Sequence, residues 1–147
     1  MSSLGDLSAL VGQLAERNQE SHKVLNCVEG KLAAMDLDLE VWLLNDPLTS
    51  HMAVVDGKSH VVAKVIGFGP HNGGQILLVR DIVHAQEEDW AAKGIASYGA
   101  PKPLRDASRD LRFLAIGKLD LLVDAITHQA RILIQAFDAG RKAQKNC

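Results

Sequence analysis

Apolar residues recur at alternating spacings of three and four along the first 36 residues. From Leu4 to Met35, eight of the ten positions on this stripe are apolar, which is the pattern of a helix that packs one edge against another helix. A continuous helix over the stretch would extend about 48 Å at about 1.5 Å per residue, more than the rest of a small domain covers. We therefore predict that residues 1–36 form a coiled-coil-like helix that pairs between copies of the chain. The predicted interface consists of Leu4, Leu7, Val11, Leu14, Asn18, Leu25, Val28 and Leu32.

Asn18 has two interpretations. At an inward position of a parallel dimer it meets the same amide of the partner, which fixes the register at some cost in stability. Alternatively, Asn18 and Ser21 mark the point where the stripe becomes exposed to solvent. Gly12 and Gly30 weaken a rigid coil by about 1 kcal/mol each relative to alanine, and Gly30 is a possible end of the helix.

The period changes from helical to two after Met35. Alternating apolar and polar residues, separated by Gly, Asn and Pro signals, predict a small antiparallel sheet over residues 37–84. The expected strands are 37–44, 51–55, 59–67 and 75–84, with a glycine-rich connector at 68–74.

The last part of the chain predicts a crossover and a second long helix. Residues 85–102 combine three acidic residues with glycines and prolines, which is typical of a surface loop with at most a helical turn around Trp90. From Pro103 onward, apolar residues again follow a helical period to 143. The predicted fold class is α+β, a single domain over 1–147 with a long N-terminal helix, a three- to four-stranded antiparallel β-meander and a long C-terminal helix.

Composition and charge exclude several functional classes. Sixteen basic against eighteen acidic residues give a net charge of −2, and only 4% of residues are aromatic. The chain therefore lacks the positive field and the stacking platforms expected of a nucleic-acid binder. No long apolar run predicts a membrane span or a signal peptide, and two cysteines are too few for a disulfide framework, so we expect a cytoplasmic protein.

A basic face on the predicted sheet is the one candidate ligand site. If the strands fold symmetrically about His71, the side chains of His60, Lys64, Arg80 and His84 share one face, which suits an anionic small molecule or an acidic partner. The alternative is a solvated or helix-covered face with snorkelling side chains. The histidines have no metal-ligand spacing, and no reactive side chain has an evident activating group, so we expect neither a metal, a cofactor nor a catalytic residue.

These patterns lead to two main functional interpretations. The first is a non-enzymatic, homo-oligomeric interaction or adaptor protein that assembles through its helices and also contacts another protein. The second is a small anionic-ligand binding or sequestering accessory protein of bacterial or phage type. An enzyme of unknown class is the third.

Overall fold

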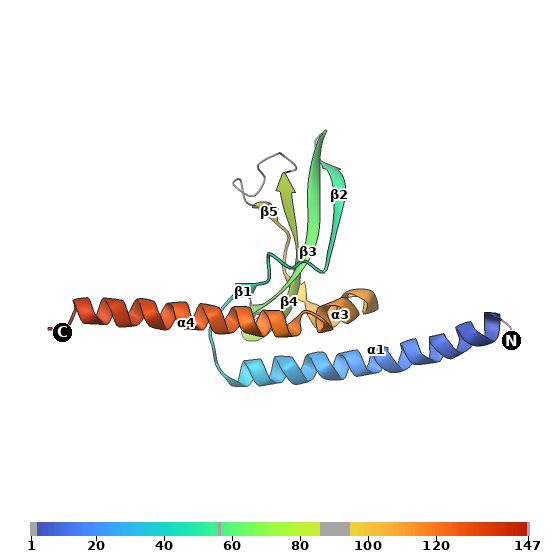
Figure 1. Ribbon diagram of the computed structural model, residues 1–147, viewed down its shortest axis with the longest axis horizontal. Coiled ribbons are helices and arrows are strands. Elements are labelled where there is room, and N and C mark those ends of the chain that lie inside the picture. The colour runs from blue at the N-terminus through green and yellow to red at the C-terminus, as the bar shows by residue number, and fades with distance from the viewer. Residues whose placement is uncertain (1–2, 56, 86–94, 147) are drawn as a thin grey trace.

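The computed structural model describes residues 3–55, 57–85 and 95–146 (Figure 1). Two long helices, α1 (Ser3–Ala34) and α4 (Leu119–Ala143), lie at the base of the molecule, and an antiparallel sheet rises from them. A short helix, α3 (Arg109–Ile116), lies beside the start of α4. The predicted α+β class is confirmed. Within the described ranges, each helix is too short or too polar to span a lipid bilayer.

Six strands form one antiparallel sheet in the described part of the chain. The strands β1, β3, β4 and β5 are neighbours in that order, while β2 pairs with β3 and β6 pairs with β4. Their bounds are Val41–Trp42 for β1, Thr49–Val55 for β2, Lys58–His71 for β3, Gly74–Ala85 for β4, Ile95–Tyr98 for β5 and Lys102–Pro103 for β6.

The long hairpin of β3 and β4 turns more tightly than the sequence predicted. Asn72 and Gly73 have φ angles of 51° and 84°, so both central residues are in the left-handed region of a two-residue hairpin loop. Asn and Gly tolerate this conformation with little steric cost. The predicted connector at 68–74 is therefore wrong, because β3 continues through Phe68 to His71 before the turn.

Two other predicted boundaries differ. The strand expected at 37–44 is reduced to Val41–Trp42, because Asp36 and Asp38 have φ angles of 52° and 49° and interrupt the extended backbone. The expected loop at 85–102 contributes β5 and β6 to the sheet, and its segment 86–94, with the turn predicted around Trp90, lies outside the described residues.

The C-terminal helix predicted over 103–143 is interrupted. A 3₁₀ turn (Leu104–Asp106) and α3 precede α4, and the chain changes direction at Gly117 and Lys118. Ser108 caps α3 by accepting a hydrogen bond from the Leu111 amide. In contrast, α1 runs without a break past Gly30.

The main core lies between the helices and one face of the sheet. Ile66 and Phe68 of β3 and Leu77 of β4 are fully or almost fully buried there. Leu25 and Leu32 from α1, and Leu122 and Ile126 from α4, close the same cluster. A smaller cluster on the opposite face contains Ala63, Val65 and Ile82, with Trp42 and Ile95 packed against it.

Candidate interaction surface

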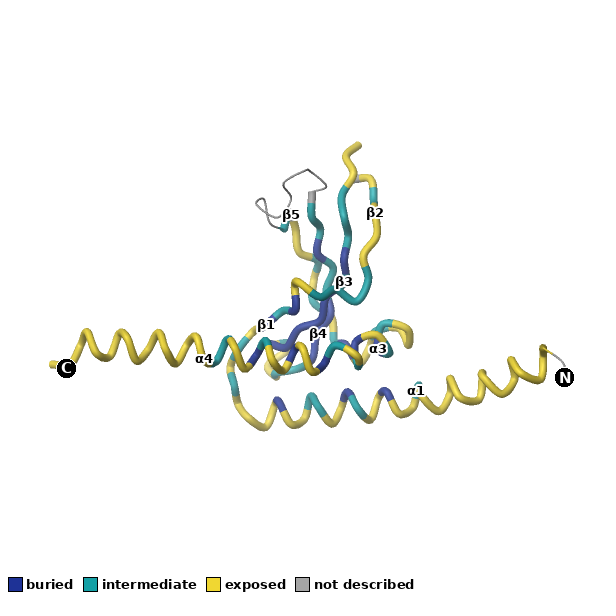
Figure 2. Tube along the Cα trace, viewed as in Figure 1, coloured by how far each residue is buried: buried dark blue, intermediate teal, exposed yellow. Residues whose placement is uncertain are grey.

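Both long helices extend beyond the core, and their projecting parts are exposed throughout (Figure 2). In α1, residues 3–17 are all exposed, and the first buried residue is Ser21. In α4, the last buried residue is Ile126, and residues 131–143 are all exposed. We call residues 3–17 the α1 arm and residues 131–143 the α4 arm.

The α1 arm carries an apolar stripe in full contact with solvent. Leu4 is 77% exposed and Leu14 is 39% exposed, with three further large apolar residues between them. The complete set is Leu4, Leu7, Leu10, Val11 and Leu14. This stripe is the N-terminal half of the interface predicted from the sequence.

The C-terminal half of that predicted interface is used within the chain itself. Leu25 and Leu32 are buried in the main core, and Val28 is half-buried and packs against it. Leu25 and Leu32 are therefore unavailable to a second copy, and the prediction is corrected at these two positions, whereas Val28 is only partly covered. The physical reason is that the sheet and α3 cover the C-terminal half of α1, which the heptad pattern alone does not reveal.

The α4 arm has a comparable apolar surface that the sequence analysis did not assign to an interface. Four large apolar residues are exposed, and Phe137, at 69%, is the most exposed of them. The set is Ile132, Leu133, Ile134 and Phe137. A shallow hollow lies beside Phe137 and Gly140 near the end of the helix.

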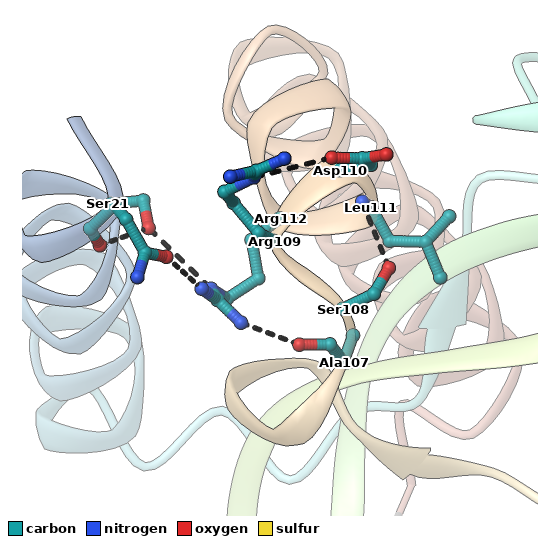
Figure 3. Close-up of polar contacts among 8 residues, drawn as sticks. Ser21, Ala107, Ser108, Arg109, Asp110, Leu111 and Arg112 are labelled. Carbon is teal, nitrogen blue, oxygen red and sulfur yellow. Dashed lines mark hydrogen bonds and ion pairs between the residues drawn. The ribbon is translucent and has the colours of Figure 1, made fainter. Parts of the chain in front are cut away.

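The junction between the α1 arm and the core is held by Arg112 of α3 (Figure 3). This arginine is only 7% exposed. Its guanidinium group donates hydrogen bonds to the Ala107 carbonyl at 2.5 Å, to Ser21 Oγ at 3.4 Å and to Asn18 Oδ1. Asn18 therefore already accepts a hydrogen bond from an arginine of its own chain, and its pairing with the same amide of a partner stays a prediction. The alternative, that the stripe becomes exposed at Asn18 and Ser21, is wrong for Ser21, which is buried.

The basic face predicted on the sheet is not assembled. In the observed register, Lys64 lies opposite Asp81 and Val65 lies opposite Arg80. Because side chains opposite one another point to the same side of a sheet, Lys64 and Arg80 emerge on different faces. The same rule separates half-buried His60, opposite Ala85, from half-buried His84, opposite Val61.

The two basic side chains nearest the middle of the hairpin already have partners. Lys64 Nζ lies 2.7 Å from Asp81 Oδ1 in a partly exposed ion pair. Arg80 donates to the Gly99 carbonyl at 2.9 Å, and its guanidinium carbon lies 4.8 Å and 4.9 Å from the ring centres of Trp42 and Tyr98. Arg80 therefore acts as a packed cation between two aromatic rings.

A cleft of about 250 Å³ is lined by three basic residues, Lys64, Arg80 and Lys102, and by two acidic ones, Asp81 and Asp106. Lys64 and Arg80 therefore both border this cleft although they emerge on different faces of the sheet, and the excess of one positive charge favours an anion only weakly. Across the described ranges, no group of three or more His, Cys, Asp or Glu side chains is arranged to hold a metal ion. Comparison of the chain with protein-family models, curated proteins and solved structures gives no match.

Proposed function

We propose that this chain is a non-enzymatic interaction protein that assembles with copies of itself through its two helical arms. The observation that carries the proposal is the continuity of the apolar stripe on α1. The same three-and-four spacing packs against the core from Leu25 to Leu32 and is bare from Leu4 to Leu14. The exposed half of the stripe, from Leu4 to Leu14, does not pack against the core, so the fold alone does not explain why these positions are apolar.

The energetic cost of leaving the arms unpaired supports the same conclusion. Burial of a large aliphatic side chain stabilises by roughly 1.5–3 kcal/mol when it is complete. Nine large apolar side chains on the two arms are more than a third exposed. Their burial between copies is a driving force of the size that offsets the loss of translational and rotational freedom on association.

The helical state of the arms also favours a partner. The α1 arm contains 15 residues and the α4 arm 13. Each arm continues a helix that the core already holds, so no new helix has to nucleate, but the turns of the arm itself lie in water, where helix stability is marginal without packing. Contact with a second helix supplies that packing for both arms.

Sedimentation velocity at roughly 1 to 100 µM, a range that spans weak self-association, tests the proposal. We expect the wild-type mass to rise with concentration, and the Leu7→Glu, Val11→Glu variant to sediment as a monomer. Ala9→Glu, Gln13→Glu is the matched control, because it adds the same charge to the same arm away from the Leu7–Val11 stripe. A wild-type chain that stays monomeric at the highest concentration contradicts the proposal, as does equal dissociation by both double variants.

A further inference from the structure

We infer that the α1 arm of one copy pairs in parallel with the α4 arm of the next, so that assembly is head-to-tail. This inference rests on the proposed self-association and names the two surfaces that meet. In Figure 1 the helices α1 and α4 run in the same direction, yet their arms leave the core at opposite ends. Moving a second copy along the common helix direction therefore brings its α4 arm alongside the α1 arm of the first. The arms match in length, at roughly 22 Å and 20 Å for a rise of about 1.5 Å per residue.

The apolar spacings of the two arms match in this parallel arrangement. On the α1 arm, Leu4, Leu7, Val11 and Leu14 follow a 3-4-3 spacing, and on α4 the residues with the same spacing are Ala130, Leu133, Phe137 and Gly140. Aligned in order, Leu7 meets Leu133 and Val11 meets Phe137. Leu14 then meets the hollow beside Gly140, where a glycine leaves room for a large partner. Small residues thus oppose large ones at both ends.

Charge favours unlike arms over like arms. The α1 arm carries Asp6, Glu16 and Arg17, a net charge of −1, whereas the α4 arm carries a net charge of +2. The charged residues of the α4 arm are Arg131, Asp138, Arg141 and Lys142. Two α4 arms would bring two positive segments together, and two α1 arms would bring two negative ones. Pairing of one arm of each kind brings opposite charges together, which favours this arrangement.

The core offers a receiving groove at the base of the α1 arm. Side chains of α1 and α3 line a groove of about 660 Å³, with Val24, Phe113 and Ile116 supplying its apolar part and Glu20 lying at its side. In the parallel alignment the end of the neighbouring α4 arm reaches this level of α1. Arg17 and Glu20 both line the groove, so its charges balance and the groove contributes apolar contact rather than a further charge match.

Complementation between two blocked variants tests the pairing. One variant carries Leu7→Glu, Val11→Glu on the α1 arm, and the other carries Leu133→Glu, Phe137→Glu on the α4 arm. Because every head-to-tail contact needs one arm of each kind, each variant alone is expected to be monomeric. An equimolar mixture retains one intact pair of arms and should form a heterodimer with twice the mass of one chain and nothing larger.

The possible outcomes separate this inference from the proposed function. A monomeric wild-type chain overturns both. Assembly of the α4-blocked variant alone indicates pairing of two α1 arms, and assembly of the α1-blocked variant alone indicates pairing of two α4 arms. Either result, or a mixture that remains monomeric while the wild type assembles, overturns the head-to-tail inference and leaves self-association intact. Circular dichroism checks that both variants keep their fold, as expected for substitutions at exposed positions.

Disulfide trapping tests the parallel register without disrupting the arms. In a Cys27→Ser, Cys147→Ser background, a chain with Leu7→Cys should cross-link to a chain with Leu133→Cys under mild oxidation. A chain with Val11→Cys is the control, because in the parallel register it lies about one helical turn from position 133, too far for the roughly 4.4–6.8 Å Cα separation of a disulfide. In antiparallel arms with the same spacings Val11 would lie opposite Leu133, so preferential cross-linking through Val11→Cys overturns the inference.

Discussion

Replacement of Gly67 by alanine should destabilise the fold, although alanine normally improves on glycine within a strand. A Cβ atom built at Gly67 lies 2.5 Å and 2.6 Å from two ring atoms of Trp42 and 2.7 Å from the Val41 carbonyl oxygen. Ordinary carbon contacts begin at about 3.5 Å, so the ring would have to move by about 1 Å. The ring has little freedom to do so, since Trp42 pairs with Gly67 across the sheet and stacks on Arg80.

The expected magnitude follows from two opposing effects. Overpacking of a filled site typically costs about 1–3 kcal/mol. Removal of glycine's extra backbone freedom returns roughly 0.5–1 kcal/mol. We therefore expect Gly67→Ala to lower the free energy of unfolding by about 1–2 kcal/mol, which corresponds to a fall in Tm of roughly 2–8 °C for a chain of this size.

Urea unfolding of four chains at one fixed protein concentration measures this effect. The chains are the wild type, Gly67→Ala, Trp42→Ala and the double variant. If the ring causes most of the penalty, Gly67→Ala should cost less once Trp42 is alanine, although the contact with the Val41 carbonyl oxygen remains, and the coupling energy should be at least about 1 kcal/mol. The reasoning is refuted if Gly67→Ala is harmless in the wild type, or if it costs the same in both backgrounds.

Three further predictions have definite expected outcomes. Gly30→Ala, in an exposed helical position with open space around its Cβ, should raise Tm by roughly 2–4 °C in differential scanning calorimetry, because alanine favours a helix by about 1 kcal/mol. Glu29→Ala should cost about 1–3 kcal/mol in urea unfolding, because the Leu77 amide loses the carboxylate that accepts its hydrogen bond at 3.0 Å, and Glu29→Gln should cost less. A double-mutant cycle between Arg112→Ala and Asn18→Ala should give a coupling energy of about 0.5–3 kcal/mol, whereas strict additivity would mean that their hydrogen bond contributes nothing.

Periodicity identified the two long helices and the central hairpin but not what covers each face. The stripe on α1 is equally regular at Leu7 and at Leu25, yet the first residue is bare and the second is buried. A hydrophobic pattern indicates that a face of a helix needs a packing partner. Which partner covers that face depends on whether the sheet lies close enough to reach it. The sequence therefore predicted the correct stripe and assigned its C-terminal half to the wrong neighbour.

The four basic residues do not share one face because the predicted register of the hairpin was wrong. The prediction centred the hairpin on His71, whereas the turn lies at Asn72 and Gly73. A shift of the pairing by an odd number of residues places opposite side chains on the other face, so Lys64 and Arg80 were separated. The sequence contains the Asn-Gly pair, which is a stronger signal for a two-residue hairpin loop than the surrounding glycines and proline. A prediction based on this pair would have placed the turn correctly.

Two local features had weaker signals. The interruption of the C-terminal helix at Gly117 has no proline to mark it, and a single glycine within a helical pattern is compatible with continuity. Arg112 lies among apolar residues of α3, and the sequence there shows only an isolated charge. The oxygens that accept its hydrogen bonds belong to Asn18 and Ser21 of α1, which are far away in the sequence.

The opposite projection of the two arms gives a row of copies a polarity. If the arms pair as inferred, one terminal copy presents an unmatched N-terminal helix and the other presents an unmatched C-terminal helix, so the two ends of the row are chemically different. Growth at one end can then be stopped by a molecule that imitates a single arm, without affecting the opposite end.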